Sequence, residues 1–293
     1  MPQKDRHQER IVPIEFETDE TFKEIPADER VTVALITQGM ASFILNGEAV
    51  TVNAPCVMLL SCCDSLKIVD KSRLAAKSFS FNPSFINSAL TFESLRDDRF
   101  SDIEDEHDRN MMNMFLKRDE KYSGYIDIPS GAYLRISEWL SIIGTETFSQ
   151  SDGKWTCRIR RYLLQVLYLI DEIYDSEQRG NAKTLKEPVN VALEYIQVNY
   201  PNEITLDGIC RLANINRTTL NKRFKEKVGM TAIEYLVHYR IKIACEALSH
   251  TNLTISEIAE STGFKYDTYF IRQFEKKMGI SPAKYRNEAW QSL

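Results

Sequence analysis

Hydrophobic residues follow two different periods along this chain. Between residues 31 and 81 they form short runs separated by turn residues, which is typical of β-strands. The runs cover residues 31–37, 41–45, 49–52, 56–60 and 75–81. Asn46-Gly47 separates two of them and predicts a tight hairpin, because both residues tolerate a positive φ. The pattern predicts a small β-barrel or sandwich.

Farther along the chain, apolar residues recur every three or four positions and predict two amphipathic helices. Helix 131–148 carries an apolar stripe of Tyr133, Ile136, Trp139, Leu140 and Ile143. The stripe of helix 155–174 consists of Trp155, Ile159, Tyr162, Leu163, Val166, Ile170 and Ile173. Further apolar residues widen this second stripe beyond what one intramolecular partner usually covers: Leu164, Leu167, Tyr168 and Leu169. The second helix is therefore expected either to form a dimer or to pack against the β-rich part.

The C-terminal third of the chain contains one helical pattern twice. Apolar residues at i, i+3, i+4 and i+7 predict a helix at 206–213, and a similar string occupies 255–262. Three residue pairs in the two copies are each 50 positions apart: Phe224 and Phe274, Gly229 and Gly279, Tyr235 and Tyr285. Each copy predicts a helix-turn-helix, the motif that places a helix in the DNA major groove.

Single residues mark the boundaries of these helices. Asn214 and Gly263 fall between the two helices of each copy, and both residue types accept left-handed backbone. Asn216 can cap the helix that follows it. Residues 232–248 predict one helix that joins the copies, roughly 25 Å long at 1.5 Å per residue. That length suits two helices in successive major grooves, so that each protomer covers nearly two turns of DNA.

The second copy carries a string of residues at characteristic spacing: Gly263-Phe264, Tyr269-Phe270, Arg272, Phe274, Lys276-Lys277, Gly279, Ser281-Pro282 and Tyr285-Arg286. With these residues, the stretch 188–288 resembles the DNA-binding domain of the AraC/XylS family of bacterial transcription regulators. Asn214, Ala232 and Tyr266 depart from that pattern, where the family usually has glycine, proline and a capping residue. The resemblance implies a cupin-like sensor barrel, holding a small effector, ahead of the DNA-binding domain.

The expected fold class is α+β. A small N-terminal β-barrel (cupin-like) with a helical dimerisation segment precedes an all-α C-terminal domain, in which a long helix joins two helix-turn-helix units. The expected domains are the cupin-like sensor barrel at 1–110, the helical dimerisation segment at 111–176, a polar linker at 177–187 and the AraC-type DNA-binding domain at 188–293.

Charge divides the chain in the same place. Residues 188–293 contain 14 Lys or Arg against 11 Asp or Glu, whereas residues 1–187 contain 23 against 31. In the C-terminal part the cations gather on the second helix of each copy: Arg217, Lys222, Arg223, Lys225 and Lys227, then Arg272, Lys276 and Lys277. The first helices carry acidic residues instead, which favours phosphate contacts over an ordinary solvated face.

Helix geometry selects the DNA-binding candidates. If Leu220, Phe224 and Val228 face inward, the outward residues of the first copy are Arg217, Thr218, Asn221 and Lys222. If Phe270 and Phe274 face inward in the second copy, the outward residues are Asp267, Thr268, Ile271 and Arg272, which match family positions that contact DNA. Arg272 suits guanine, Asn221 suits adenine and Ile271 suits a thymine methyl group. Tyr269 is placed for the DNA backbone.

The sequence contains no recognisable motif for catalysis or for binding a metal. The histidines are His7, His107, His238 and His250, and none lies in the β runs, which argues against a cupin metal site. No phosphate-binding loop, nucleophile elbow or zinc spacing occurs. We expect no catalytic residue, metal or cofactor, so an enzyme of cupin fold fused to a DNA-binding tail is a remote alternative.

The six cysteines are relevant to the cellular compartment of the protein. The chain opens without an apolar signal segment, so free thiols in the cytoplasm are expected, and no apolar run is long enough for a membrane span. Cys210 and Cys245 fall on apolar helix faces and suit the core. The adjacent Cys62-Cys63 could be a redox or electrophile sensor.

The function expected from these patterns is a sequence-specific DNA-binding transcriptional regulator, an activator by family analogy. Its N-terminal part would sense a small molecule, dimerise, or do both, and its partners would be double-stranded DNA, a small-molecule effector, RNA polymerase by family analogy, and a second copy of the chain. In the alternative, the N-terminal half binds no ligand and serves only for dimerisation or protein docking.

Overall fold

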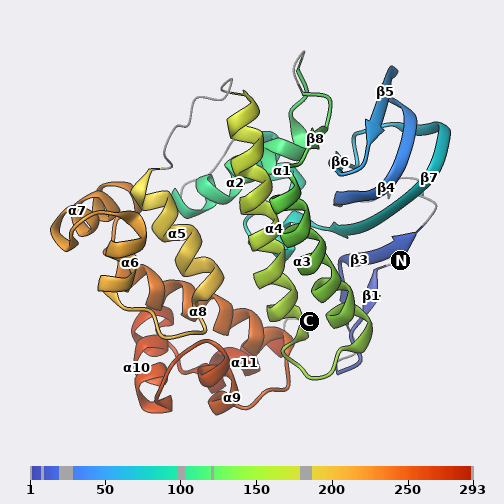
Figure 1. Ribbon diagram of the computed structural model, residues 1–293. Helices are drawn as coiled ribbons and strands as arrows, with labels where there is room; N and C mark the ends of the chain where they lie inside the picture. Colours follow the sequence, from blue (N-terminus) through green and yellow to red (C-terminus); the bar gives the residue numbers. More distant parts are fainter. Residues whose placement is uncertain are drawn as a thin grey trace. The chain divides into compact units, whose positions relative to one another are not determined.

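The computed structural model describes residues 2–7, 10–19, 29–97, 103–119, 122–178 and 187–291. The chain divides into two compact units (Figure 1). One comprises Met1–Lys4, Ile11–Gln150 and Thr156–Thr184, and the other comprises Asp5–Arg10, Ser151–Trp155 and Leu185–Leu293. Most of the expected linker 177–187 lies outside the described residues. Among the helices of the described ranges, none has the length and apolar character that crossing a membrane requires.

The first unit is built on an antiparallel sheet of six described strands in the order β3-β7-β4-β6-β8, with β5 paired to β4. The strands are β3 (Ile14–Asp19), β4 (Val31–Leu45), β5 (Glu48–Asn53), β6 (Cys56–Ser61), β7 (Leu66–Phe81) and β8 (Tyr125–Asp127). A separate pair joins β1 (Gln3–Lys4) to β2 (Ile11–Val12). The expected hairpin at Asn46-Gly47 is confirmed, because both residues have a positive φ, 53° and 89°, between β4 and β5.

The expectation of a closed barrel is wrong, because the sheet is open. Strand β3 pairs with β7 and β8 pairs with β6, so the two ends of the sheet do not hydrogen-bond to each other. The runs predicted as two strands at 31–37 and 41–45 are one long strand, β4, whose pairing with β7 shifts register on both sides of Gln38. Gly39 lies at this register shift. Its φ is +80°, and a Cβ there would lie 2.3 Å from the carbonyl oxygen of Ser72, so glycine is required.

The interior of the sheet is apolar and continuous. Side chains from β4, β5, β6 and β7 form one buried cluster, which includes Ile36, Phe43, Val52, Met58 and Leu60. Strand β6 is buried at every position from Cys56 to Ser61, because α2 (Ile103–Leu116) packs against it. A strand buried on both faces reads as a continuous apolar run, which is the pattern that its sequence shows.

The remaining helices of this part are η1 (Pro83–Phe85), α1 (Phe92–Asp97), α3 (Ser130–Ser149) and α4 (Trp155–Gln178). Helix α3 packs on β3 and β7, and Gly144 leaves room for the ring of Phe16, which a Cβ would approach to 2.3 Å. The residues that widen the stripe of α4 are at most 9% exposed: Leu164, Leu167, Tyr168 and Leu169. The dimer contact expected for this helix stays a prediction.

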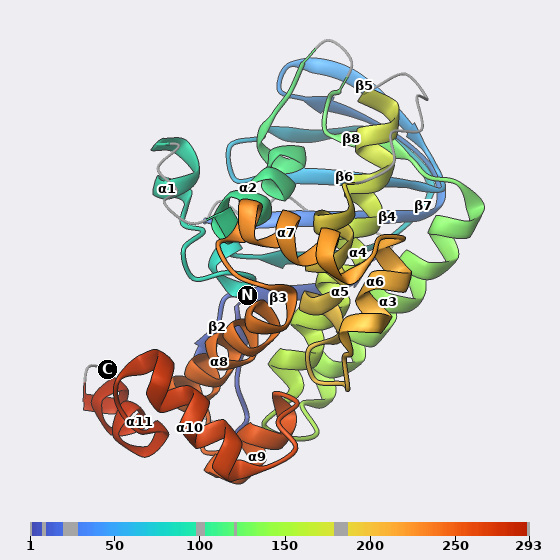
Figure 2. The ribbon, with the colours of Figure 1, turned by 90° about the vertical axis from the view of Figure 1, so that its left-hand side faces the viewer.

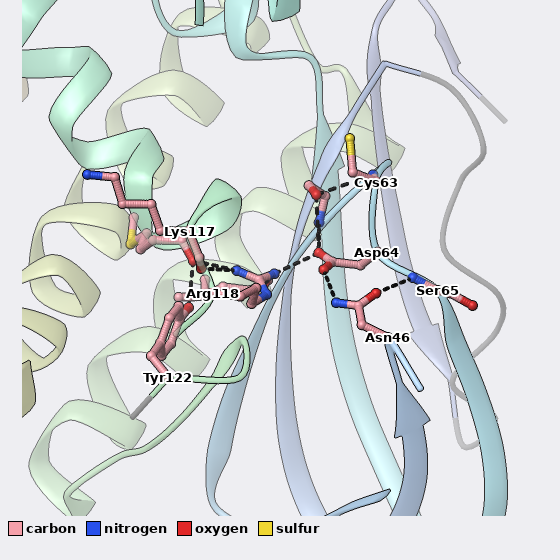
Figure 3. Close-up of polar contacts among 10 residues, drawn as sticks. Asn46, Cys63, Asp64, Ser65, Lys117, Arg118 and Tyr122 are labelled. Atoms are coloured by element: carbon pink, nitrogen blue, oxygen red, sulfur yellow. Dashed lines mark hydrogen bonds and ion pairs between the residues drawn. The ribbon is translucent and has the colours of Figure 1, made fainter. Parts of the chain in front are cut away.

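One buried ion pair ties three loops of the first unit together (Figure 3). The Asp64 carboxylate accepts hydrogen bonds from Arg118 Nη2 at 2.6 Å, from Asn46 Nδ2 at 2.7 Å and from the Ser61 backbone N–H at 2.7 Å. Arg118 also donates to the carbonyl oxygen of Leu59 at 2.8 Å. Its guanidinium carbon lies 5.5 Å from the ring centroid of Tyr122. The network joins the β4–β5 turn, the β6–β7 turn and the segment that follows α2.

The second unit is helical and contains the duplication expected from the sequence. Its helices are α5 (Pro188–Asn199), α6 (Leu206–Ala213), α7 (Arg217–Val228), α8 (Ala232–His250), α9 (Ile255–Ser261), α10 (Asp267–Met278) and α11 (Pro282–Gln291). Helix α8 lies between the pairs α6–α7 and α9–α10 in both views (Figure 2). Phe224 belongs to the buried core beside α6 and α7, whereas Phe270 and Phe274 belong to a separate cluster with α9.

Local backbone signals set the ends of these helices. Asn214 and Gly263 have φ values of 52° and 87°, so both predicted left-handed turns are confirmed. Asn216 accepts a hydrogen bond from the Thr219 N–H at 2.8 Å and caps α7 as expected. Tyr266 makes no side-chain capping bond to α10, in line with its departure from the family pattern.

Candidate nucleic-acid interface

The outer face of α7 begins where Asn216 caps the helix. Arg217, Thr218 and Lys222 are exposed there, as the helix geometry predicts. Asn221 is half-buried, and its side-chain Oδ1 is buried without a hydrogen-bond partner among the described residues. Its oxygen is therefore turned toward the protein, and a bidentate contact with adenine requires this amide to reorient.

Arg217 is held by an acidic residue of the preceding helix. Its Nε donates to Asp207 Oδ1 at 2.6 Å, and Nη2 donates to Oδ2 of the same carboxylate. Hydrogen bonding to Arg217 lowers the pKa of Asp207, and the same contact raises the pKa of Arg217. Because the two side chains are 57% and 64% exposed, a phosphate can replace the carboxylate at small cost. The sequence did not predict this pair, whose partners are ten residues apart and lie on different helices.

The first turns of α10 present a second exposed surface. Asp267, Thr268, Tyr269 and Arg272 are all exposed. The guanidinium carbon of Arg272 lies 5.5 Å from the centroid of the Tyr269 ring, a cation–π contact that supports the arginine on the outer face. The tyrosine thus positions Arg272 in addition to facing the solvent itself.

The position of Ile271 differs from the sequence prediction, which placed it on the outer face of the helix. It is half-buried, and its side chain packs against the core of the second helix pair rather than pointing freely outward. The helix turns this position partly toward α9, so a contact with a thymine methyl group is limited to the exposed part of the side chain. Tyr266, which the helix geometry did not select, is 62% exposed beside the start of α10, and Lys265 Nζ lies 5.6 Å from its ring centroid.

Other cations border both faces. Arg223 and Lys225 on α7 are exposed, as are Lys276 and Lys277 on α10. Lys227 is engaged instead, because its Nζ donates to Glu187 Oε2 at 2.6 Å and to Asn190 Oδ1 at 2.7 Å. Each helix pair therefore presents its second helix with an exposed, mainly basic surface, the arrangement that suits a polyanion with grooves.

Comparison with known proteins identifies the helical unit. Residues 209–288 match a family model described as a helix-turn-helix domain. The lactose operon transcription activator of Staphylococcus xylosus is 32% identical over 129 residues, which cover 44% of this chain and 46% of that protein. The C-terminal unit is a helix-turn-helix domain of the AraC type. The chain spans less than half the length of these curated relatives.

Solved structures also match the AraC-type domain. The C-terminal domain of AraT, a response regulator from Geobacillus stearothermophilus, is 34% identical, and the match covers 36% of this chain and 88% of that chain with a TM-score of 0.34. A transcriptional regulator with an AraC-type DNA-binding domain from Chromobacterium violaceum is 22% identical over 35% of this chain and 91% of that chain, with a TM-score of 0.34.

The thiols ahead of the AraC-type domain occupy unequal environments. Burial raises the pKa of Cys56 to about 12, and burial together with the neighbouring Cys63 raises the pKa of Cys62 to about 11. Cys63 is exposed, and its Sγ lies 3.9 Å from Arg96 Nη2. The described residues contain no group of three or more His, Cys, Asp or Glu that could hold a metal ion.

These environments predict unequal alkylation of Cys56, Cys62 and Cys63 by iodoacetamide in the native protein at pH 8. A thiol with a pKa of about 11 is thiolate to roughly one part in a thousand at that pH, and the thiolate is the nucleophile. Cys63 should react first, Cys62 much more slowly, and buried Cys56 only after urea is added. Peptide mass spectrometry over a time course measures the order. Equal rates at Cys62 and Cys63 would remove the basis for this ranking.

Proposed function

We propose that this protein is a sequence-specific transcriptional regulator that binds double-stranded DNA through α7 and α10, its two recognition helices. The observation that carries the proposal is the duplicated helix pair, which presents an exposed, mainly basic second helix in each copy. Two such helices can occupy successive major grooves on one side of the duplex. The AraC-type domain and the regulators that resemble it support the same function.

The proposed roles of the interface residues follow their exposure. Arg272 reads guanine from α10, with Tyr269 supporting it and contacting the DNA backbone. Thr218 and Lys222 on α7, and Asp267 and Thr268 on α10, complete the set of outward side chains. Arg217 exchanges Asp207 for a phosphate or base when DNA binds.

A retention experiment tests this function. The full-length protein is incubated with sheared genomic DNA from its own source at moderate salt, and the retained fragments are sequenced. Enrichment of a motif spanning about two helical turns is the expected result. Binding to all fragments alike, with a steep salt dependence, would instead show an electrostatic binder without sequence preference.

The N-terminal half is proposed to control this binding in the cytoplasm, through a small-molecule effector, a second copy of the chain, or both. Activation through RNA polymerase follows from family analogy, and one similar protein is the lactose operon transcription activator of Staphylococcus xylosus. A ligand can act only if it binds two arrangements of the protein with unequal affinity. In the alternative, this half binds no ligand and serves dimerisation or protein docking. A thermal shift on adding candidate metabolites separates the two.

The contribution of Arg272 is open to direct measurement. Replacing it with alanine should weaken binding to a selected site by about 1–3 kcal/mol and relax the choice at one base pair, because a bidentate base contact is lost. Lys284→Ala is the control, since it removes one cation from α11, where Lys284 faces Glu288 at 3.7 Å. Fluorescence anisotropy with the site and its single-base variants gives both quantities. If Arg272→Ala lost affinity equally for every variant, Arg272 would be a phosphate contact and not a base reader.

A further inference from the structure

The long helix α8 carries an arginine that contacts both the segment leading into the first helix pair and the turn of the second pair. Arg240 Nε donates to the carbonyl oxygen of Tyr200, and Nη2 donates to the carbonyl oxygen of Asn202, both at 2.8 Å. These carbonyls belong to the segment between α5 and α6, which leads into the first pair. The guanidinium carbon also lies 5.7 Å from the ring centroid of Phe264, in the turn between α9 and α10. One half-buried side chain therefore bridges the two halves of the AraC-type domain.

The backbone of the second turn meets the first pair at the same place. Gly263 has a φ of +87°, and a Cβ on it would lie 2.5 Å from the Tyr200 oxygen and 2.9 Å from the Pro201 oxygen. The same Cβ would lie 2.8 Å from Arg240 Nη2. The α9–α10 turn thus packs directly on the chain that enters α6, and Arg240 closes this junction.

A row of side chains leads from the junction to the reading face of α10. The centroids of the Phe264 and Tyr269 rings lie 6.0 Å apart, and the guanidinium carbon of Arg272 lies 5.5 Å from the centroid of the Tyr269 ring. Close-packed side chains transmit strain, so these contacts link the position of Arg240 to that of Arg272.

We propose that Arg240 is a positioning residue that fixes the spacing and rotation of the two recognition helices, so that the two major-groove segments of a site are bound as one unit. The inference rests on the proposed DNA-binding function. A guanidinium directs its N–H groups in a rigid fork, and two such bonds to backbone carbonyls define an angle as well as a distance. Lysine keeps the charge but lacks the fork. When α7 and α10 are held at a fixed spacing, binding of the second groove segment becomes an intramolecular step once the first segment is bound. The overall affinity for the site therefore rises.

The test compares full-length wild type, Arg240→Lys and Arg240→Met, with Lys284→Met as a control that removes an exposed cation from α11. The probe is a duplex selected by the wild type from a random-sequence library. Two derivatives are made, one with a single base pair inserted between the groove segments and one with the α7 segment scrambled. Inserting one base pair rotates one segment by roughly a tenth of a turn relative to the other.

Wild type and Lys284→Met should lose about tenfold in affinity on insertion, comparable to losing one base-reading side chain. Both Arg240 variants should bind the selected duplex about tenfold more weakly, show little further loss on insertion, and bind the scrambled duplex as well as wild type does. If Arg240→Lys binds with wild-type affinity and shows the wild-type dependence on spacing, the inference about Arg240 is wrong. The proposed DNA-binding function would still stand. A wild type that selects no duplex would overturn the proposed function itself. If Arg240→Met fails to fold, Arg240→Lys and Phe264→Leu supply the same comparison.

Discussion

Replacing Arg118 with methionine is expected to lower the free energy of unfolding of the first unit by about 3 kcal/mol. The Asp64 side chain is 5% exposed, so the substitution leaves a buried carboxylate without its cation. The Leu59 carbonyl loses its donor at the same time. Urea denaturation gives the free energy, and hydrogen exchange in β6 and β7 shows whether the loosening begins at the turn that Asp64 holds.

Two further variants make this prediction specific. Lys67→Met removes an exposed cation from β7 and should change stability by less than about 0.5 kcal/mol. Asp64→Asn, added to Arg118→Met, should recover part of the loss because it removes the unpaired charge. An additive double mutant would mean that the two side chains do not interact, contrary to the network in Figure 3.

Replacing Gly263 with alanine is expected to destabilise the AraC-type domain by about 3 kcal/mol, from a left-handed backbone and an overpacked junction together. The new methyl group would lie 2.5 Å from the Tyr200 carbonyl oxygen, where neither backbone can yield without opening the contact. Thermal and urea unfolding of the full-length protein, followed by helical circular dichroism, measure the loss.

Gly279 separates the two causes. Its φ is +75°, but a Cβ there would meet no atom within 4 Å, so Gly279→Ala carries only the conformational cost of about 1 kcal/mol. Gly229, with a φ of +77° and open space, should behave in the same way. Equal losses at Gly263 and Gly279 would mean that the junction relaxes around the methyl group and does not hold the two helix pairs rigidly.

The helical unit was predictable from the sequence because its signals are local. A left-handed turn at Asn214, a cap at Asn216 and an apolar stripe depend on neighbours within a few residues, and the structure has all three. The contacts of Arg240 were not predictable, because its partners are backbone carbonyls 38 and 40 positions away, and carbonyls carry no sequence signal. The partial burial of Ile271 likewise depends on how α9 and α10 pack.

The topology of the sheet could not be predicted from local sequence pattern alone. The β runs and the Asn46-Gly47 hairpin were visible, but closure depends on which edge strands meet, and that is decided by pairing over long separations. The wide stripe of α4 had two explanations of similar weight. Local pattern does not choose between them, and the dimer contact stays a prediction.

The separate cores of the two helix pairs bear on how such a domain can change over evolutionary time. Phe224 is buried among α5, α6, α7 and α8, whereas Phe270 and Phe274 are buried with α9 and the far end of α8. Substitutions on the exposed face of α7 therefore leave the cluster around Phe270 and Phe274 intact, because that cluster contains no residue of α7. A descendant protein can acquire a new preference in one half of its operator while the other half keeps it attached to the old promoter.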